Sequence, residues 1–490
     1  MPKLLPEVFV SHAEIALYVS REVKKGNLRK LGSRVYTTNL SEPPEVLARR
    51  HAWALVGELF PGAVVVDRTA LEHRPAADGS VFIISNKKRP VILPGLSIYP
   101  RKGAAPLPED KPFIGGLYLA CPARAYLENL IQRRARKGSL ARTVSREEME
   151  EKLETLLQVA GPEALQTLRQ DAHQISLTLH LTKEFKILDS LIGTLLGTRK
   201  SPVTSPLAIA RVQGHPYDAK RLDLFQKLYE VLANTPSVHR TIAHTGTALP
   251  FFEAYFSNFI EGTEFEVEEA AHIIFEGKIP KDRPQDAHDI LGTYQMTSDF
   301  KEMKRIPQNE DELIHLLKSR HACLMQSRPE VKPGEFKTIP NRAGLTFFVA
   351  PELVEGTLRQ GFKWLQALET PFQKAAYMMF LISEVHPFVD GNGRCARLMM
   401  NSELIAADQA RIIIPTNLWN NYLSALKILS LNHRAEPLIR VLDFAQNYTS
   451  LINWSSFKNA QQMLKETHAF DDPNTSDLIG IQLTLPTTRP

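Results

Sequence analysis

The stretch HPFVDGNGRCAR, from His386 to Arg397, decides the fold of the C-terminal half of this 490-residue chain. The segment before it, PFQKAAYMMFLISEV (371–385), is apolar enough to form a central buried helix. The segment after it, RCARLMMNSELIAA (394–407), is rich in good helix formers. Between them, DGNG has the composition of a tight turn. The sequence therefore predicts two helices joined by a short loop that leads into the N-terminus of the second helix.

A loop of this kind is suited to bind phosphate. The first turn of a helix presents unpaired backbone N–H groups and the positive end of the helix dipole. Gly391 and Gly393 let the backbone approach a ligand without interference from a Cβ atom. Arg394 and Arg397 are three residues apart, so they occupy neighbouring positions of the first turn and can contact further phosphate oxygens. We expect a phosphate site at this junction.

Two further residues of the stretch add chemistry. Asp390 offers the hard oxygen ligand that Mg²⁺ needs when it bridges phosphates and keeps most of its waters. His386 is suited to accept a proton from an attacking hydroxyl near neutral pH. Each residue alone also has a structural interpretation, because DGNG is a common turn and a histidine before proline is usually structural. Their occurrence together within one short stretch favours the functional interpretation.

The stretch resembles the signature of the Fic family, HPFx(D/E)GNGRxxR, and matches it at every fixed position. Members of this family typically transfer AMP from ATP to a Ser, Thr or Tyr hydroxyl of a protein. Relatives that transfer another group usually alter the glycine loop, so AMP transfer is favoured over phosphoryl transfer. The resemblance implies that His386 is the base, that Asp390 binds Mg²⁺, and that the phosphates are held by Gly391, Asn392, Gly393, Arg394 and Arg397.

The resemblance covers about residues 217–450 and implies a mainly α-helical catalytic domain, which we place at 217–455. Residues 338–350 are predicted to form a short β-hairpin, similar to the flap that docks the protein target by strand addition. Tyr422, in WNNYLSAL, lies in a segment similar to the helix that borders the adenine and is a candidate stacking residue. An aromatic residue at helical spacing is more often part of the core. The expected partners are ATP, a protein target and, by self-modification, the chain itself.

A second motif lies further upstream, in AYFSNFIEGTEF. Ser257 and Glu261 are four residues apart, so they share one helix face, and Gly262 follows as a helix stop. Without context this is an ordinary amphipathic helix end. SNFIEG, however, matches the (S/T)xxxE(G/N) motif of Fic proteins that carry an N-terminal inhibitory helix. The resemblance implies that Glu261 pairs with Arg397 and repels the γ-phosphate of ATP.

The N-terminal part is expected to be α/β, so the whole chain is predicted to be multidomain. Residues 1–125 read as a winged-helix-like start, with a helix followed by a hairpin, and then a small α/β domain. Residues 126–200 read as a helical connector. A segment rich in Pro, Thr and Ser at 197–216 marks the domain boundary, and residues 468–490 read as a flexible tail.

Two other functions stay open. The same loop could hold AMP that is already attached to a protein, with Glu261 orienting a water molecule to remove it. The N-terminal region loosely resembles the winged-helix antitoxin and regulator domains of abortive-infection systems, which implies DNA binding. The basic residues that would serve it are Lys24, Lys25, Arg29, Lys30 and Arg34, whereas the cluster Arg133, Arg134, Arg136 and Lys137 reads as a solvated helix end.

Composition narrows the class of protein. With 59 Lys and Arg against 54 Asp and Glu, the formal charge is only +5, too small for a nucleic-acid coat over this length. Three widely spaced cysteines argue against a disulfide framework and against a zinc site. The longest apolar run, AAYMMFLI from Ala375, is too short to span a bilayer. We expect a cytoplasmic protein with no membrane partner.

Overall fold

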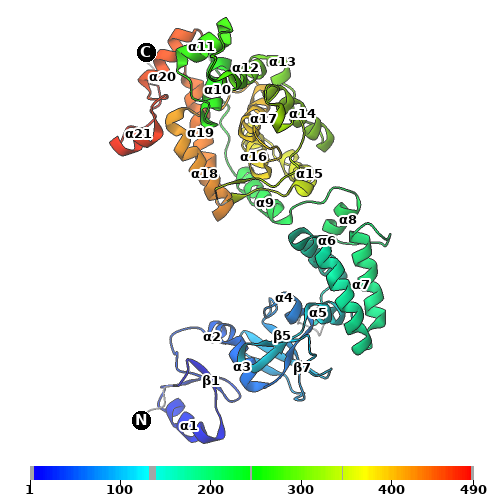
Figure 1. Ribbon diagram of the computed structural model, residues 1–490. Helices are drawn as coiled ribbons and strands as arrows, with labels where there is room; N and C mark the ends of the chain where they lie inside the picture. Colours follow the sequence, from blue (N-terminus) through cyan, green and yellow to red (C-terminus); the bar gives the residue numbers. More distant parts are fainter. Residues whose placement is uncertain (1–4, 132–139, 243–245, 345, 487–490) are drawn as a thin grey trace. The chain divides into compact units, whose positions relative to one another are not determined.

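The computed structural model describes residues 5–131, 140–242, 246–344 and 346–486. The chain forms two compact units, Met1–Val212 and Gln213–Pro490 (Figure 1). The division falls inside the Pro, Thr and Ser rich segment. Helix α8 (Pro206–Val212) belongs to the first unit because Arg211 forms an ion pair with Glu154, 2.6 Å away.

The first unit begins with a small three-stranded sheet of order β1-β3-β2, all antiparallel. The expected helix is α1 (Ala16–Lys24), preceded by a 3-10 turn, and the expected hairpin is β2 (Arg29–Gly32) with β3 (Val35–Thr37). Strand β1 (Val8–Val10), which the sequence patterns did not indicate, pairs with β3. The resemblance to winged-helix domains stays a prediction.

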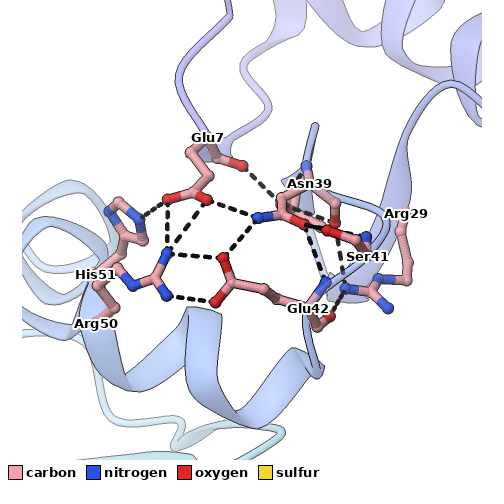
Figure 2. A network of polar contacts seen from close by, with 8 residues as sticks. Glu7, Arg29, Asn39, Ser41, Glu42, Arg50 and His51 are labelled. Atoms are coloured by element: carbon pink, nitrogen blue, oxygen red, sulfur yellow. Dashed lines mark hydrogen bonds and ion pairs between the residues drawn. The ribbon is translucent and has the colours of Figure 1, made fainter.

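A network of polar side chains joins this small sheet to the helix that follows it (Figure 2). Glu7 accepts hydrogen bonds from Asn39 (2.8 Å) and contacts His51 Nε2 (2.7 Å). Glu42 accepts a hydrogen bond from Asn39 (3.0 Å) and forms an ion pair with Arg50. These contacts tie the end of helix α2 (Pro44–Arg50) to the residue that precedes β1 and to the segment between β3 and α2.

The small α/β domain contains a six-stranded mixed sheet of order β6-β7-β5-β4-β9-β8. Its central strands are buried because both faces are covered, and the surrounding core is dominated by Val, Leu, Ile and Ala. The strands are β4 (Val64–Val65), β5 (Ser80–Ile84), β6 (Val91–Leu93), β7 (Leu96–Arg101), β8 (Lys111–Phe113) and β9 (Leu117–Leu119), and the helices are α3 (Ala52–Leu59), α4 (Asp67–Glu72) and α5 (Pro122–Asn129).

Two long helices complete the first unit. Helix α6 (Arg146–Thr178) starts at a capping box made by Ser145 and is interrupted at Gly161, whose φ of 78° is left-handed. Helix α7 (Thr182–Leu195) packs along it and shares its apolar core.

The second unit is helical and is built around two buried helices, α16 (Pro371–Val385) and α17 (Asn392–Ala406). Almost every residue of α16 is buried, as its apolar sequence predicts. The other helices are α9 (Ala219–Ala233), α10 (Ala248–Ile260), α11 (Val267–Glu276), α12 (Pro284–Ser298), α13 (Phe300–Met303), α14 (Glu310–Leu324), α15 (Val354–Gln366), α18 (Trp419–Asn432), α19 (Glu436–Leu451) and α20 (Phe457–Glu466). The predicted flap is a hairpin of two very short strands, β10 (Arg342–Ala343) and β11 (Thr346–Phe347).

The C-terminal segment differs from the expected flexible tail. Residues Pro473–Ile479 form helix α21, whose first turn is capped by Asp472. Asn417 Nδ2 donates a hydrogen bond to Ser476 Oγ (3.2 Å), and the backbone N–H of Leu483 donates to Asn417 Oδ1 (3.2 Å). The polar composition that suggested disorder instead supplies a helix cap and contacts to the start of α18.

Candidate active site

The loop between α16 and α17 has the geometry that its sequence predicts. His386 ends α16 in the left-handed region (φ 52°), and Gly391, also left-handed (φ 74°), is the N-cap of α17. Asn392 closes the loop on itself: its Oδ1 accepts a hydrogen bond from Phe388 N (2.8 Å), and its Nδ2 donates to Phe388 O (2.9 Å). Asn392 therefore shapes the loop through its side chain.

A histidine outside the motif, His321, contacts two residues of the loop and holds it in place. His321, on α14, is fully buried, and its ring stacks on Phe388 with centroids 3.6 Å apart and planes within 1°. Gly334 N donates to His321 Nδ1 (2.9 Å), so the proton is on Nε2, which donates to Asp390 O (3.0 Å). Burial lowers the pKa of His321 to about 4, which keeps the ring neutral and the tautomer fixed.

The segment that leads into the flap holds the other carbonyl groups of the loop. Lys337 N donates to Pro387 O (2.9 Å), and Asn341 Nδ2 donates to Phe388 O (2.9 Å). The Lys337 ammonium donates to Asn341 Oδ1 (2.7 Å) and is almost completely buried, which lowers its pKa to about 8. The loop is thus pre-organised by groups that lie more than forty residues away in sequence.

His386, the predicted base, is partly buried and neutral. Its Nδ1 lies 3.3 Å from the carbonyl oxygen of Ser383, which can only accept, so Nδ1 carries the proton and Nε2 has a free lone pair. Burial lowers the pKa of His386 to about 4; the bond to Ser383 O opposes this and the nearby charge of Lys337 adds to it. The ring of Phe348 stacks on the imidazole at 3.8 Å.

Arg394 is buried and already has a counter-ion. Its Nη1 lies 2.7 Å from Oδ2 of Asp289, a buried carboxylate on α12. The same carboxylate forms an ion pair with Arg328, whose Nη2 is 2.8 Å from Oδ2. Asp289 therefore orients two arginines at once, and no local sequence signal had marked it.

Arg397 makes hydrogen bonds to α10, the helix that carries the second motif. Its Nε donates to Ser257 Oγ (3.0 Å), and its Nη2 donates to Ser257 O (2.8 Å) and to Glu261 Oε1 (2.7 Å). Glu261 is the C-cap of α10, and Gly262 follows in the left-handed region (φ 86°). The predicted partners Glu261 and Arg397 are thus in direct contact.

These groups meet at one cavity of about 270 Å³, whose lining includes His386, Gly393, Arg397, Glu261 and Tyr422. Tyr422 is buried, and its hydroxyl donates to Met379 Sδ (3.3 Å). The structure therefore brings the predicted base, the end of the predicted phosphate loop and the candidate adenine residue to the same cavity.

Asp390 lies at the mouth of the loop, and about half of its side chain is exposed. Its Oδ1 accepts the N–H of Gly391 (2.7 Å), while Oδ2 is 3.7 Å from Arg394 Nη2. In the described part of the chain, no cluster of three or more His, Cys, Asp or Glu forms a metal cage. One accessible carboxylate beside a phosphate loop suits a hydrated Mg²⁺, which takes its remaining ligands from phosphates and water.

Two of the five basic residues proposed for DNA binding, Arg29 and Arg34, are held by contacts within the fold. Arg29 donates to the carbonyl oxygens of Asn39 and Glu42, and Arg34 Nε donates to Ser11 O (3.1 Å). Lys25 forms an exposed ion pair at 2.9 Å, which contributes little to stability. The cluster at 133–137 lies outside the described residues. DNA binding stays a prediction.

Parts of the chain are similar to known proteins. Residues 312–404 match the model of the Fic/DOC family. Protein adenylyltransferase fic-1 of Caenorhabditis elegans is 26% identical over 196 residues, which are 39% of this chain and 38% of that protein. Protein adenylyltransferase Fic of Drosophila persimilis is 31% identical over 106 residues, 21% of each chain. The solved structure of Fic-1 from C. elegans covers 67% of this chain and 95% of its own, with 18% identity and a TM-score of 0.35.

The matched region spans well under half of the length of these two curated relatives. The region that matches the family model, residues 312–404, contains the loop from His386 to Arg397 and also His321, but neither Glu261 nor Tyr422. Among the described helices, none combines the length and the low polarity that are needed to cross a bilayer.

Proposed function

We propose that this chain, which contains a Fic domain, is a protein adenylyltransferase that transfers AMP from ATP to a Ser, Thr or Tyr hydroxyl of a protein and releases pyrophosphate. The observation that supports this most directly is the single cavity lined by His386, Gly393 and Arg397. It combines a neutral base, an open helix N-terminus and a guanidinium, which are the groups that phosphate chemistry on a hydroxyl requires.

In the proposed reaction, Nε2 of His386 accepts the proton of the target hydroxyl. The hydroxyl oxygen forms a bond to the α-phosphorus as the bond between that phosphorus and the bridging oxygen of the pyrophosphate breaks, in line. The negative charge of the departing pyrophosphate is stabilised by the backbone N–H groups at Gly391–Gly393 and by Arg394 and Arg397. The low pKa of His386 means that the base is already deprotonated at neutral pH.

Asp390 would hold Mg²⁺ together with the phosphates of ATP. When bound, the ion supplies positive charge that offsets the charge of the phosphate oxygens. The carboxylate suits this role because it is accessible and because its orientation is held by the N–H of Gly391.

The contact between Glu261 and Arg397 supports the proposal that α10 inhibits the enzyme. A carboxylate on Arg397 occupies the guanidinium that would bind the γ-phosphate and places a negative charge where that phosphate would lie. The ATP can then bind only in an unproductive pose. Release of Glu261 would free Arg397 for ATP.

The hairpin of β10 and β11 is the proposed docking site for the protein target. In the described part of the chain its two-residue strands pair only with each other. The carbonyl oxygen of Phe347 accepts a hydrogen bond from Arg221 Nη2 (2.6 Å), so the remaining outer backbone groups are the ones available to an added strand. Transfer to a hydroxyl of the chain itself is a further proposed reaction. The three free cysteines support a reducing, cytoplasmic location.

A second candidate is removal of AMP from a modified protein. It is favoured by the position of Glu261, whose carboxylate lines the same cavity as His386 and keeps a side-chain exposure of 25%. Such a carboxylate could orient a water molecule for attack on the phosphorus. The two reactions predict opposite effects of the loss of Glu261. Transfer of AMP would be activated, whereas removal of AMP would be abolished.

The test compares the unmodified chain, Glu261→Gly, and the double variant Glu261→Gly with His386→Ala. Each is incubated with MgATP, and the intact mass is measured for added AMP. Modification of the Glu261→Gly variant alone is the expected result. An equal gain of mass in the unmodified chain would contradict inhibition by Glu261, and a gain of mass in the double variant would contradict the role of His386.

A further inference from the structure

The flap and the proposed base are joined by one aromatic contact. Phe348 directly follows strand β11, and its ring lies on the imidazole of His386, with centroids 3.8 Å apart and planes within 5°. Its neighbour Phe347 points the opposite way, as alternate residues of an extended chain do, and is 66% exposed. Two adjacent phenylalanines therefore face two different environments.

The other contacts of His386 leave its ring plane weakly held. The torsion that turns an imidazole about its Cβ–Cγ bond has a broad energy minimum. Among the described residues, the only hydrogen bond that the ring makes is the one that Nδ1 donates to Ser383 O, which is long at 3.3 Å. A flat ring at van der Waals distance restricts this rotation far more than a single long hydrogen bond does.

Phe348 is placed chiefly by the residue that follows it. Val349 is buried in the main core, and the backbone N–H of Phe348 makes a long hydrogen bond to the carbonyl oxygen of Asn341 (3.3 Å). Asn341 also binds the motif loop through Phe388 O (2.9 Å). The flap strand and the loop that carries His386 are therefore held to each other by Asn341, and Phe348 has a fixed place over the base.

We infer that Phe348 is a positioning residue that fixes the plane of the His386 imidazole, so that Nε2 faces the cavity, and shields one face of the ring from water. This inference rests on the proposed role of His386 as the base. It assigns a function in the reaction to a flap residue that does not itself exchange protons.

The charged groups around His386 come from three directions. Lys337 lies on the flap side, Glu261 comes from α10, and Asp390 and Arg397 come from the loop and from α17. Lys337 disfavours the protonated ring, whereas Glu261 and Asp390 favour it. The Lys337 ammonium lies 5.9 Å from the centroid of the Phe348 ring and is also held by Asn341 Oδ1 (2.7 Å). Because that hydrogen bond does not depend on Phe348, we expect Lys337 to stay in place when Phe348 is lost, and a change in the titration of His386 then reports the loss of shielding.

The first test follows the titration of His386 by NMR of the full chain with labelled histidine rings, and the signal is assigned from its absence in His386→Gln. The variants are Phe348→Leu, which removes the flat ring, Phe348→Tyr, which keeps it, and Phe347→Leu as the matched neighbour. We expect the midpoint to rise by about one to two pH units in Phe348→Leu only. An unchanged midpoint in Phe348→Leu, or an equal rise in Phe347→Leu, would overturn the inference. This readout does not depend on any enzymatic activity.

The second test measures self-modification with radiolabelled ATP in a Glu261→Gly background. Phe348→Leu should lower kcat about ten- to a hundredfold, with little change in the KM for ATP, and Phe348→Tyr should restore kcat. The acidic limb of the pH profile should move to higher pH in Phe348→Leu. A fall in ATP affinity with unchanged kcat would contradict positioning of the base. Absence of AMP transfer from every Glu261→Gly sample would instead refute the proposed function and leave the NMR result standing.

Discussion

The carboxylate of Glu261 lies directly over Gly393, so that a Cβ atom at position 393 would overlap with Glu261 Oε1 and would lie 3.0 Å from Arg397 Nη1. The absence of a side chain at position 393 therefore makes room for the proposed inhibitory residue. In the proposed function this position would serve two ligands in turn, the carboxylate of Glu261 and the phosphates of ATP.

The contact between Glu261 and Arg397 is the last in a row of polar contacts between α10 and α17. Glu253 and Glu261 are eight residues apart on one face of α10, with Ser257 between them. Asn401 Nδ2 donates to Glu253 Oε1 (2.8 Å), and Arg397 contacts both Ser257 and Glu261. Glu253, in the middle of α10, also pairs with the buried Arg411 and anchors this part of the helix. The last turn of α10 is therefore the part that can release Arg397.

Removal of the Glu261 side chain should activate transfer. Glu261→Gly frees Arg397 for the γ-phosphate, and we expect the initial rate of AMP incorporation to rise at least about tenfold, which corresponds to about 1.4 kcal/mol of the barrier. Glu264→Gly, an exposed acidic residue three positions later, is the matched control and should leave the rate unchanged. Similar rates for Glu261→Gly and Glu264→Gly would rule out a specific inhibitory role of Glu261.

Addition of a methyl group at position 393 should break the same contact from the other side. In Gly393→Ala the flexible end of Glu261 has to move, so the hydrogen bond to Arg397 should be lost. We expect Glu261→Ala to cost about 1 kcal/mol of unfolding free energy in the parent and close to nothing in the Gly393→Ala background. Urea denaturation of the four proteins measures this coupling, and equal costs in the two backgrounds would show that position 393 and Glu261 are independent.

Loss of the carboxylate of Asp289 should leave a buried charge without its partner. Asp289→Asn removes the counter-ion of Arg394, and we expect a loss of about 3 kcal/mol of unfolding free energy together with weaker ATP binding. Asp286→Asn is the control, because Asp286 is one third exposed and contacts Arg328 alone among these arginines. Its cost should stay below about 1 kcal/mol. Denaturation and ATP titration of both variants test this, and equal losses would argue against a special role for Asp289.

Stability should depend on pH through the buried histidines. His321 and His386 have pKa values of about 4 in the folded protein, whereas an unfolded histidine titrates near 6.5. Between these values the unfolded chain binds more protons, so stability should fall as the pH drops below about 6.5 and level off near 4. His321→Gln should reduce this slope, and His315→Gln, an exposed residue of the same helix, should not. Urea midpoints from pH 7.5 to 4.5 measure the slope, and an unchanged slope in His321→Gln would contradict burial of a neutral ring.

The sequence alone determined the parts of the site that are local. His386 to Arg397 are contiguous, so the end of one helix, a glycine turn and the start of the next follow from short-range backbone preferences. Ser257 and Glu261 share a helix face for the same reason. The sequence did not indicate the ordered C-terminal helix, because polar residues such as Asp472 read equally well as a disordered tail or as a helix cap.

Only the tertiary structure decided which residues hold the loop in place. His321 and Asp289 come from two helices, α14 and α12, whereas Lys337, Asn341 and Phe348 come from the flap segment. The sequence indicated the flap, but no periodic or motif signal marked any of these five residues as a contact of the loop. Their roles depend on distances set by the packing of α12 and α14 against α17 and by the path of the flap past His386. A hydrogen bond or a ring stack forms only when two groups come within a few ångströms of each other. That proximity is a property of the packed core, which no local stretch of sequence contains.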